Sequence, residues 1–163
     1  MNLASTARPF QINKLERGLG LIQRTLVNIS QDAATTYRDG GDGWTVVEVM
    51  CHMRDFEAIF VERAKLTVEV ENADLPFPEP DKLAVDRNYN KQNLREVIDA
   101  WVKNRQAFLA YLAERSEADW ARVARHPKRG PFSLDAQVFL AAWHNFNHLD
   151  QITKILHEKK VLV

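Results

Sequence analysis

The feature that most constrains the fold is a spacing of three and four residues between apolar side chains, which recurs in four segments. The first predicts a helix over about Pro9 to Gln31, whose apolar stripe is Ile12, Leu15, Leu19, Ile22, Leu26 and Ile29. Thr45 and Glu48 form a capping box that opens a second helix. The third segment runs from Leu94 to Leu112, and the fourth from an N-cap at Ser133 to about Glu158. Four amphipathic helices predict an all-α, four-helix bundle.

A long connection separates the second and third helices. It runs from about Glu71 to Tyr89 and contains Pro76, Pro78 and Pro80, which end the helix before it. This length is too great for a tight turn between antiparallel neighbours, so we expect a crossover that traverses the bundle or covers one end of it. Ser116 predicts one short capped turn, whereas 126–131, rich in glycine and proline, predicts no regular structure. We expect one domain over residues 1–163.

Charge and cysteine content exclude several classes of protein. The chain of 163 residues carries 22 basic and 22 acidic side chains, so it lacks the positive charge typical of nucleic-acid binders. No stretch reaches the 18 to 20 apolar residues that a membrane span requires. The single cysteine, Cys51, allows no internal disulfide and fits a reducing compartment. We therefore expect a cytoplasmic protein with neither nucleic acid nor membrane as a partner.

Three histidines predict a metal site. His144 and His148 lie one helical turn apart, so their imidazoles face the same way and can bind one cation. The position after His144, where zinc hydrolases carry a glutamate base, is Asn145, which disfavours a zinc protease. His52, on the inner face of the second helix, is a third candidate ligand. The alternative for each is a buried histidine with ordinary hydrogen bonds.

Two sequence segments resemble the DinB/YfiT-like family. The first is WTVVEVMCHMRDFE (44–57), and the second joins FSL (132–134) to WHNFNHLDQI (143–152). The resemblance implies a crossover four-helix bundle, usually dimeric, in which His52, His144 and His148 bind one divalent metal ion such as zinc, nickel or iron. It also implies a metal-dependent transferase or isomerase that uses a low-molecular-weight thiol. A non-catalytic metal-binding or interaction domain of the same fold is the alternative.

Several other polar residues have two alternative roles each. Asp55 is the candidate for a catalytic base or for orienting the His52 ring, and an ion pair at the surface is its alternative. Gln151 is either a hydrogen-bond partner of a ligand histidine or an ordinary polar residue between helices. Glu48 is expected to cap its helix rather than bind metal. We expect His126 in a solvated loop, and Cys51 as a small buried apolar residue.

Overall fold

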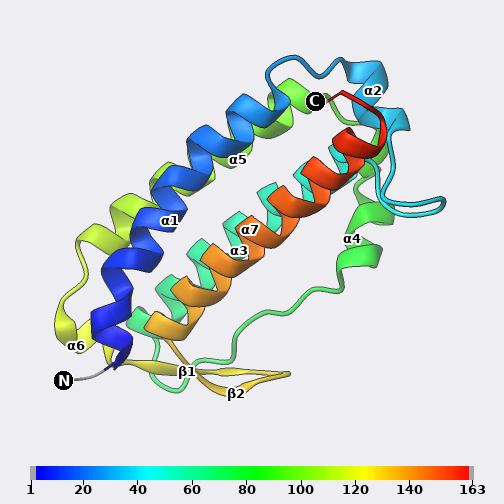
Figure 1. Ribbon diagram of the computed structural model, residues 1–163. Coiled ribbons are helices and arrows are strands. Elements are labelled where there is room, and N and C mark those ends of the chain that lie inside the picture. Colours follow the sequence, from blue (N-terminus) through cyan, green and yellow to red (C-terminus); the bar gives the residue numbers. More distant parts are fainter. Residues whose placement is uncertain (1–2, 162–163) are drawn as a thin grey trace.

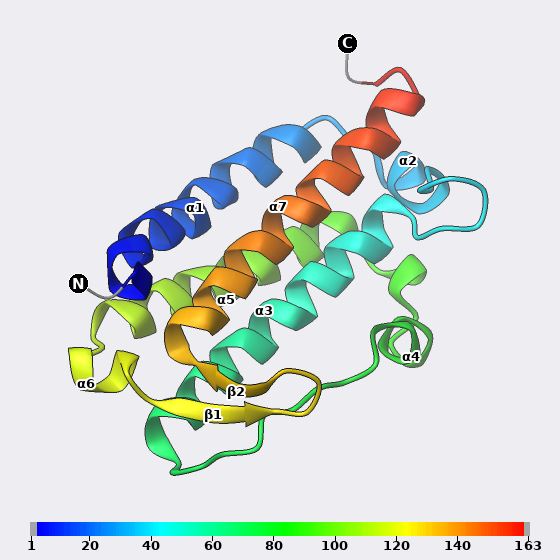
Figure 2. The same ribbon diagram turned by 60° about the horizontal axis from the view of Figure 1, so that its bottom comes forward.

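Four long helices form the bundle in the computed structural model, which describes residues 3–161 (Figure 1). They are α1 (Leu3–Leu26), α3 (Val46–Glu69), α5 (Leu94–Ala113) and α7 (Leu134–Glu158). Helix α3 packs against α5 and α7, and α1 packs against α7 and α5. Helices α3 and α5 run parallel to each other and antiparallel to α1 and α7 (Figures 1 and 2). The predicted all-α four-helix bundle is therefore confirmed.

The parallel pair α3 and α5 requires the long crossover that the sequence predicts. The chain leaves α3 at one end of the bundle and returns along its outside to begin α5 at the other end (Figure 2). This connection contains two short helices that the sequence analysis did not predict, α4 (Pro80–Asp86) and the 3₁₀ turn η1 (Tyr89–Lys91). Pro80 is the first residue of α4, where its missing N–H and fixed φ favour helix initiation.

The predicted caps place the starts of two long helices correctly. The Thr45 side chain accepts a hydrogen bond from the Glu48 backbone N–H, and the Glu48 carboxylate accepts one from the Thr45 N–H at 2.7 Å. Ser133 accepts a hydrogen bond from the Ala136 N–H and begins α7. Each contact satisfies backbone donors that a helix N-terminus leaves free. The capping role expected for Glu48 is confirmed.

The prediction for the first helix was wrong at both ends. Helix α1 begins at Leu3, with Pro9 inside it, and ends at Leu26 instead of near Gln31. Pro9 removes only one backbone hydrogen bond near the helix start, which the packed helix tolerates. Beyond Leu26 the Ser30 side chain caps a separate short helix, α2 (Gln31–Thr36), by accepting a hydrogen bond from Ala33 N–H. The predicted helix was too long because the apolar spacing continues past this break to Ile29.

A β-hairpin occupies the segment that we expected to be irregular. After the short helix α6 (Glu117–Trp120), which Ser116 caps as predicted, β1 (Val123–His126) pairs with β2 (Gly130–Ser133) in antiparallel register. The strands have only four residues, too few for an alternating pattern to stand out. Arg125 also exchanges two backbone hydrogen bonds of 2.8 Å with Ala73 and Leu75, which attaches the crossover to the hairpin.

The core has two large apolar clusters with a polar layer between them, and a third, smaller cluster of Ala73, Leu75 and Ala124 lies where the crossover meets the hairpin. One cluster includes Met53 and Trp101, and the other includes Phe60 and Phe108. Between them along α3 and α5 lie Glu57 and Arg105, which form a buried ion pair with two contacts of 2.6 Å. Gly18 of α1 and Asn145 of α7 border this layer. A Cβ on Gly18 would lie 2.8 Å from Asn145 Nδ2 and 3.5 Å from Arg105 Nη1, so only glycine lets α1 approach so closely here.

No helix in residues 3–161 combines the length and apolar content required to span a bilayer.

Candidate metal centre

The three predicted histidines meet between α3 and α7. His52 comes from α3, while His144 and His148 come from successive turns of α7. One ring nitrogen from each lies within 4.8 Å of the others, and His52 Nε2 lies 2.9 Å from His144 Nε2. The structure therefore brings together residues that are 92 positions apart in the sequence.

Burial keeps the three imidazoles neutral. His52 is 5% exposed and its ring packs between Trp44 and Phe56, at centroid distances of 5.0 and 4.3 Å. Loss of solvation, together with nearby His148, lowers the pKa of His52 to about 3. Burial also lowers the pKa of His144 and of His148. At neutral pH all three rings therefore carry lone pairs, which metal binding requires.

A chain of hydrogen bonds orients His148. Its Nδ1 donates to Gln151 Oε1 at 2.8 Å, since an amide oxygen can only accept, and this leaves Nε2 unprotonated toward the other two histidines. Gln151 Nε2 donates in turn to Asp39 Oδ2 at 3.0 Å, and Lys154 Nζ donates to Asp39 Oδ1 at 2.9 Å. Gln151 is thus a partner of a candidate ligand. The sequence analysis missed Asp39, because nothing in a glycine-rich loop signals this contact.

The donor set fits a divalent cation. His52 Nε2 and His144 Nε2 face each other, so only one of these two nitrogens can carry a proton in the hydrogen bond between them. A cation can take the place of that proton. Tetrahedral metal–imidazole bonds of about 2.0–2.1 Å place ligand nitrogens about 3.3 Å apart, within the spread of this cluster. Among the described residues, neither a cysteine nor a carboxylate joins the three histidines. Three imidazoles suit zinc, nickel, iron(II) or copper and do not select one of them.

Asp55 has partners other than the histidines. Its carboxylate accepts hydrogen bonds from Arg54 Nε at 2.8 Å and from the Tyr89 hydroxyl at 2.5 Å, and it pairs with Arg87 at 2.8 Å. In the described part of the chain it makes no hydrogen bond to the three rings. Burial raises the pKa of Asp55, but the hydrogen bonds from Arg54 and Tyr89 lower it by more, so the pKa lies below its usual value. These contacts join α3 to the crossover, and a role as base stays a prediction.

The sequence predicted the burial of Cys51 correctly and that of His126 wrongly. Cys51 is fully buried as expected, and burial raises the pKa of its thiol to about 12. The prediction for His126 was wrong, because the residue is 2% exposed and lies in β1. The hairpin turns its ring inward against Phe77 and Phe132, at centroid distances of 5.2 and 5.4 Å.

Comparison with known proteins identifies relatives of similar sequence. Two proteins of Oceanobacillus iheyensis, each named provisionally as a metal-dependent hydrolase, are 29% and 25% identical to this chain. The first match spans 91% of this chain and 85% of the relative, and the second spans 75% and 69%. They establish that similar sequences occur in proteins for which metal dependence is inferred.

Solved structures show the same fold. YfiT from Bacillus subtilis, described provisionally as a metal-dependent hydrolase with an unusual four-helix bundle topology, matches with a TM-score of 0.85 at 20% identity. The match covers 94% of this chain and 87% of YfiT. A mycothiol-dependent maleylpyruvate isomerase matches with a TM-score of 0.73 at 12% identity, over 93% of this chain and 63% of the isomerase.

A family model connects these observations. The model of the DinB superfamily matches residues 14–152, a range that includes all three histidines and the crossover. The relatives and the histidine cluster together indicate a divalent metal ion, whose identity they do not select. The chain belongs to the DinB superfamily.

Proposed function

We propose that this protein is a metal-dependent enzyme of the thiol S-transferase or isomerase type, in which His52, His144 and His148 bind one divalent metal ion. The observation that carries the proposal is the convergence of three neutral imidazoles within 4.8 Å. Three neutral ligands leave both the full charge of the cation and an open coordination position. When bound, such a cation acts as a Lewis acid that lowers the pKa of a thiol or water.

The surrounding residues hold this site in one geometry. Gln151 and Asp39 orient His148, and the aromatic rings of Trp44, Phe56 and Phe60 pack against His52 and His144 and reduce their contact with water. A preformed, partly dry site strengthens electrostatic interactions with a reacting group. The likeness in fold to a mycothiol-dependent isomerase supports a low-molecular-weight thiol as the partner.

Hydrolysis is the second candidate function. The two relatives from Oceanobacillus and YfiT are all described provisionally as hydrolases, and the same three imidazoles can activate water. The position after His144, however, is the buried Asn145, so the glutamate base of zinc proteases is missing there.

Cobalt substitution tests the thiol proposal. We expect a small thiol such as cysteine or glutathione to produce a sulfur-to-metal charge-transfer band when it is titrated into the cobalt-loaded protein, because an open position admits a thiolate. His148→Ala serves as the control that lacks a ligand. A cobalt spectrum that no thiol changes would remove the transferase and leave hydrolysis or a non-catalytic role.

A further inference from the structure

Arg63 is a buried charge without an ion-pair partner among the described residues. Its side chain is 1% exposed, and no carboxylate in the described residues lies within ion-pairing distance of it. The other buried acidic and arginine side chains, Asp55, Glu57 and Arg105, all have ionic partners. Arg63 Nε and Nη2 donate only to the carbonyl of Pro76, at 2.9 and 2.7 Å. A neutral carbonyl does not neutralise a guanidinium, and unpaired buried charges are costly.

His126 supplies an unused hydrogen-bond donor near Arg63. Its Nδ1 accepts a hydrogen bond from the Lys128 N–H at 3.1 Å, so the neutral ring carries its proton on Nε2. This Nε2–H is buried and has no partner among the described residues. Arg63 and His126 both lie against the Phe77 ring, at 5.8 and 5.2 Å from its centroid. A guanidinium without an ion-pair partner and an imidazole N–H without an acceptor therefore both lie against one aromatic ring.

The charge around this cluster favours an anion. Burial and nearby Arg129 lower the pKa of Arg63 to about 10, against the smaller, opposite effect of Glu62, so the guanidinium still carries its charge at neutral pH. Lys128 Nζ lies 4.2 Å from the centroid of the Phe77 ring and pairs with exposed Glu79. A guanidinium binds planar carboxylates through two parallel hydrogen bonds, and an imidazole N–H can add a third.

The cluster lies beside the three histidines. The Phe60 ring contacts His144 at a centroid distance of 5.4 Å, and the Arg63 guanidinium lies 5.9 Å from the centroid of the same ring. His52, Phe60 and Arg63 all belong to α3, where they follow one another down the helix. The Phe60 ring thus connects His144 to Arg63, and a ligand that contacts both must extend past this ring.

We infer that Arg63 and His126 bind a carboxylate of the substrate, so that the protein acts on a small organic acid. This inference rests on the proposed function for the identity of the reacting site. Two surface grooves border the cluster, one of about 460 Å³ at Phe77 and one of about 610 Å³ at His126.

Anion binding can be measured without any reaction. We expect succinate, but not its neutral analogue succinamide, to shift the side-chain ¹H–¹⁵N resonances of Arg63 and His126 saturably in metal-free and in zinc-loaded protein. Arg63→Gln should weaken succinate binding about tenfold to a hundredfold, the range for a lost charge-assisted hydrogen bond. Equal shifts with both probes, or none with succinate, would overturn the inference. Tighter binding of inorganic phosphate than of succinate would also overturn it.

Matched variants show whether a loss of succinate binding comes from the anion site or from misfolding. The metal-free protein shows whether succinate binding is independent of the proposed function. Arg125→Gln, on the same hairpin but exposed and paired with Asp74, should leave succinate binding unchanged. His126→Gln should weaken binding even if Arg63→Gln does not fold. Succinate binding in metal-free protein supports the inference even where the cobalt test fails. A thiol-responsive cobalt protein that binds no succinate would retain the proposed function and remove only this inference.

Discussion

Gln151 determines which nitrogen His148 presents to the cluster, because its amide oxygen accepts the proton on Nδ1. We predict that Gln151→Ala lowers zinc affinity about tenfold to a hundredfold, the usual effect of losing such a partner. Competition against a chromophoric chelator measures the change. Asp150→Ala, an exposed neighbour on α7, serves as the control. Unchanged affinity in Gln151→Ala would show that packing alone orients the ring.

The low pKa values of the histidines predict an acid-sensitive metal-free protein. In the unfolded chain a histidine takes up a proton below about pH 6.5, whereas the folded chain keeps His52 neutral to about pH 3. Acid therefore favours the unfolded state, and stability falls as pH drops below about 6.5. Each such histidine costs about 1.4 kcal/mol per pH unit.

Denaturant unfolding of metal-free protein at pH 7.5, 6.5 and 5.5 measures this loss. His52→Gln should flatten the profile, because it removes one of the titrating rings, and His157→Gln, at an exposed position, should leave it unchanged. A free energy of unfolding that stays constant across this range would contradict the buried, neutral state of the cluster.

Sequence could predict the histidines but not the contacts around them. His144 and His148 have a spacing that fixes their shared face, and His52 lies on an apolar stripe. Asp39, by contrast, reaches Gln151 from a loop 112 positions away, and periodicity carries no information about such a contact. Whether His126 is solvated depends on the direction of a hairpin, which four-residue strands do not reveal.

Among the elements, α3 and α5 depend on the ion pair that crosses the core between them. Arg105 Nη1 also donates to the Leu15 carbonyl of α1 at 2.7 Å, so the guanidinium links three helices. We predict that Glu57→Ala destabilises the protein by about 3–5 kcal/mol, because it leaves Arg105 buried without a counter-charge. Chemical denaturation measures this. Glu62→Ala, on the exposed face of α3, should change stability by less than about 0.5 kcal/mol.

The boundaries of the elements were predictable where a side chain caps the helix. Thr45 and Ser133 begin α3 and α7 as expected, because each satisfies free backbone N–H groups. The end of α1 was not predictable from its apolar stripe, since Ile29 continues the spacing after the helix has ended. The length of the crossover excluded a tight turn between antiparallel neighbours, but the sequence predicted neither the parallel direction of α3 and α5 nor the short helices within the crossover.

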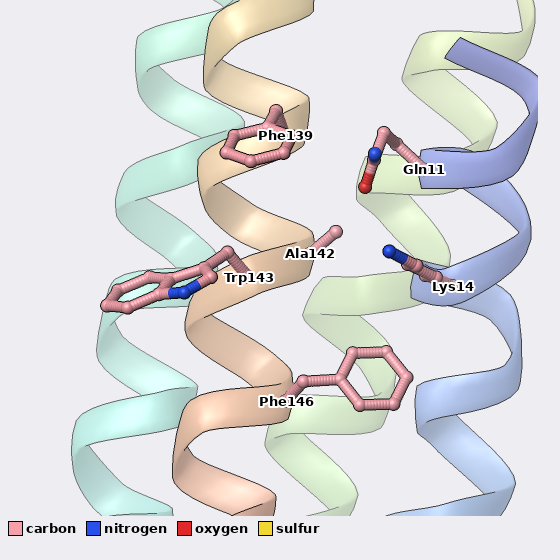
Figure 3. A pocket seen from close by; sticks show the side chains of 6 residues that line it. All are labelled: Gln11, Lys14, Phe139, Ala142, Trp143 and Phe146. Carbon is pink, nitrogen blue, oxygen red and sulfur yellow. The ribbon is translucent and has the colours of Figure 1, made fainter. Parts of the chain in front are cut away.

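At the scale of the whole molecule, an exposed aromatic surface on α7 is the candidate interface for the dimer that the family resemblance implies. Phe139, Trp143 and Phe146 follow spacings of four and three, and Phe139 and Trp143 are each 55% exposed. Phe146 points toward Lys14 of α1, while Trp143 points to the other side of α7 (Figure 3). These residues border a shallow pocket of about 240 Å³. In a two-fold dimer, a ring of one copy can enter the pocket of the other.

We predict a homodimer that Trp143→Asp converts to monomer, because a charge in a desolvated apolar contact is costly. Light scattering after size-exclusion chromatography measures the mass. Val85→Asp introduces the same charge at an exposed apolar position on α4 and should leave the dimer intact. A monomeric native protein, or a Trp143→Asp variant that stays dimeric, would exclude this surface.

Zinc titration of metal-free protein tests the central claim most directly. We predict that the native chain binds one zinc ion per molecule, that His148→Ala loses stoichiometric binding, and that His157→Ala retains it. The helical circular dichroism of all three should be the same, because a core of this size folds without the site. Equal zinc binding by native protein and His148→Ala, or no zinc uptake by native protein, would contradict the three-histidine metal centre.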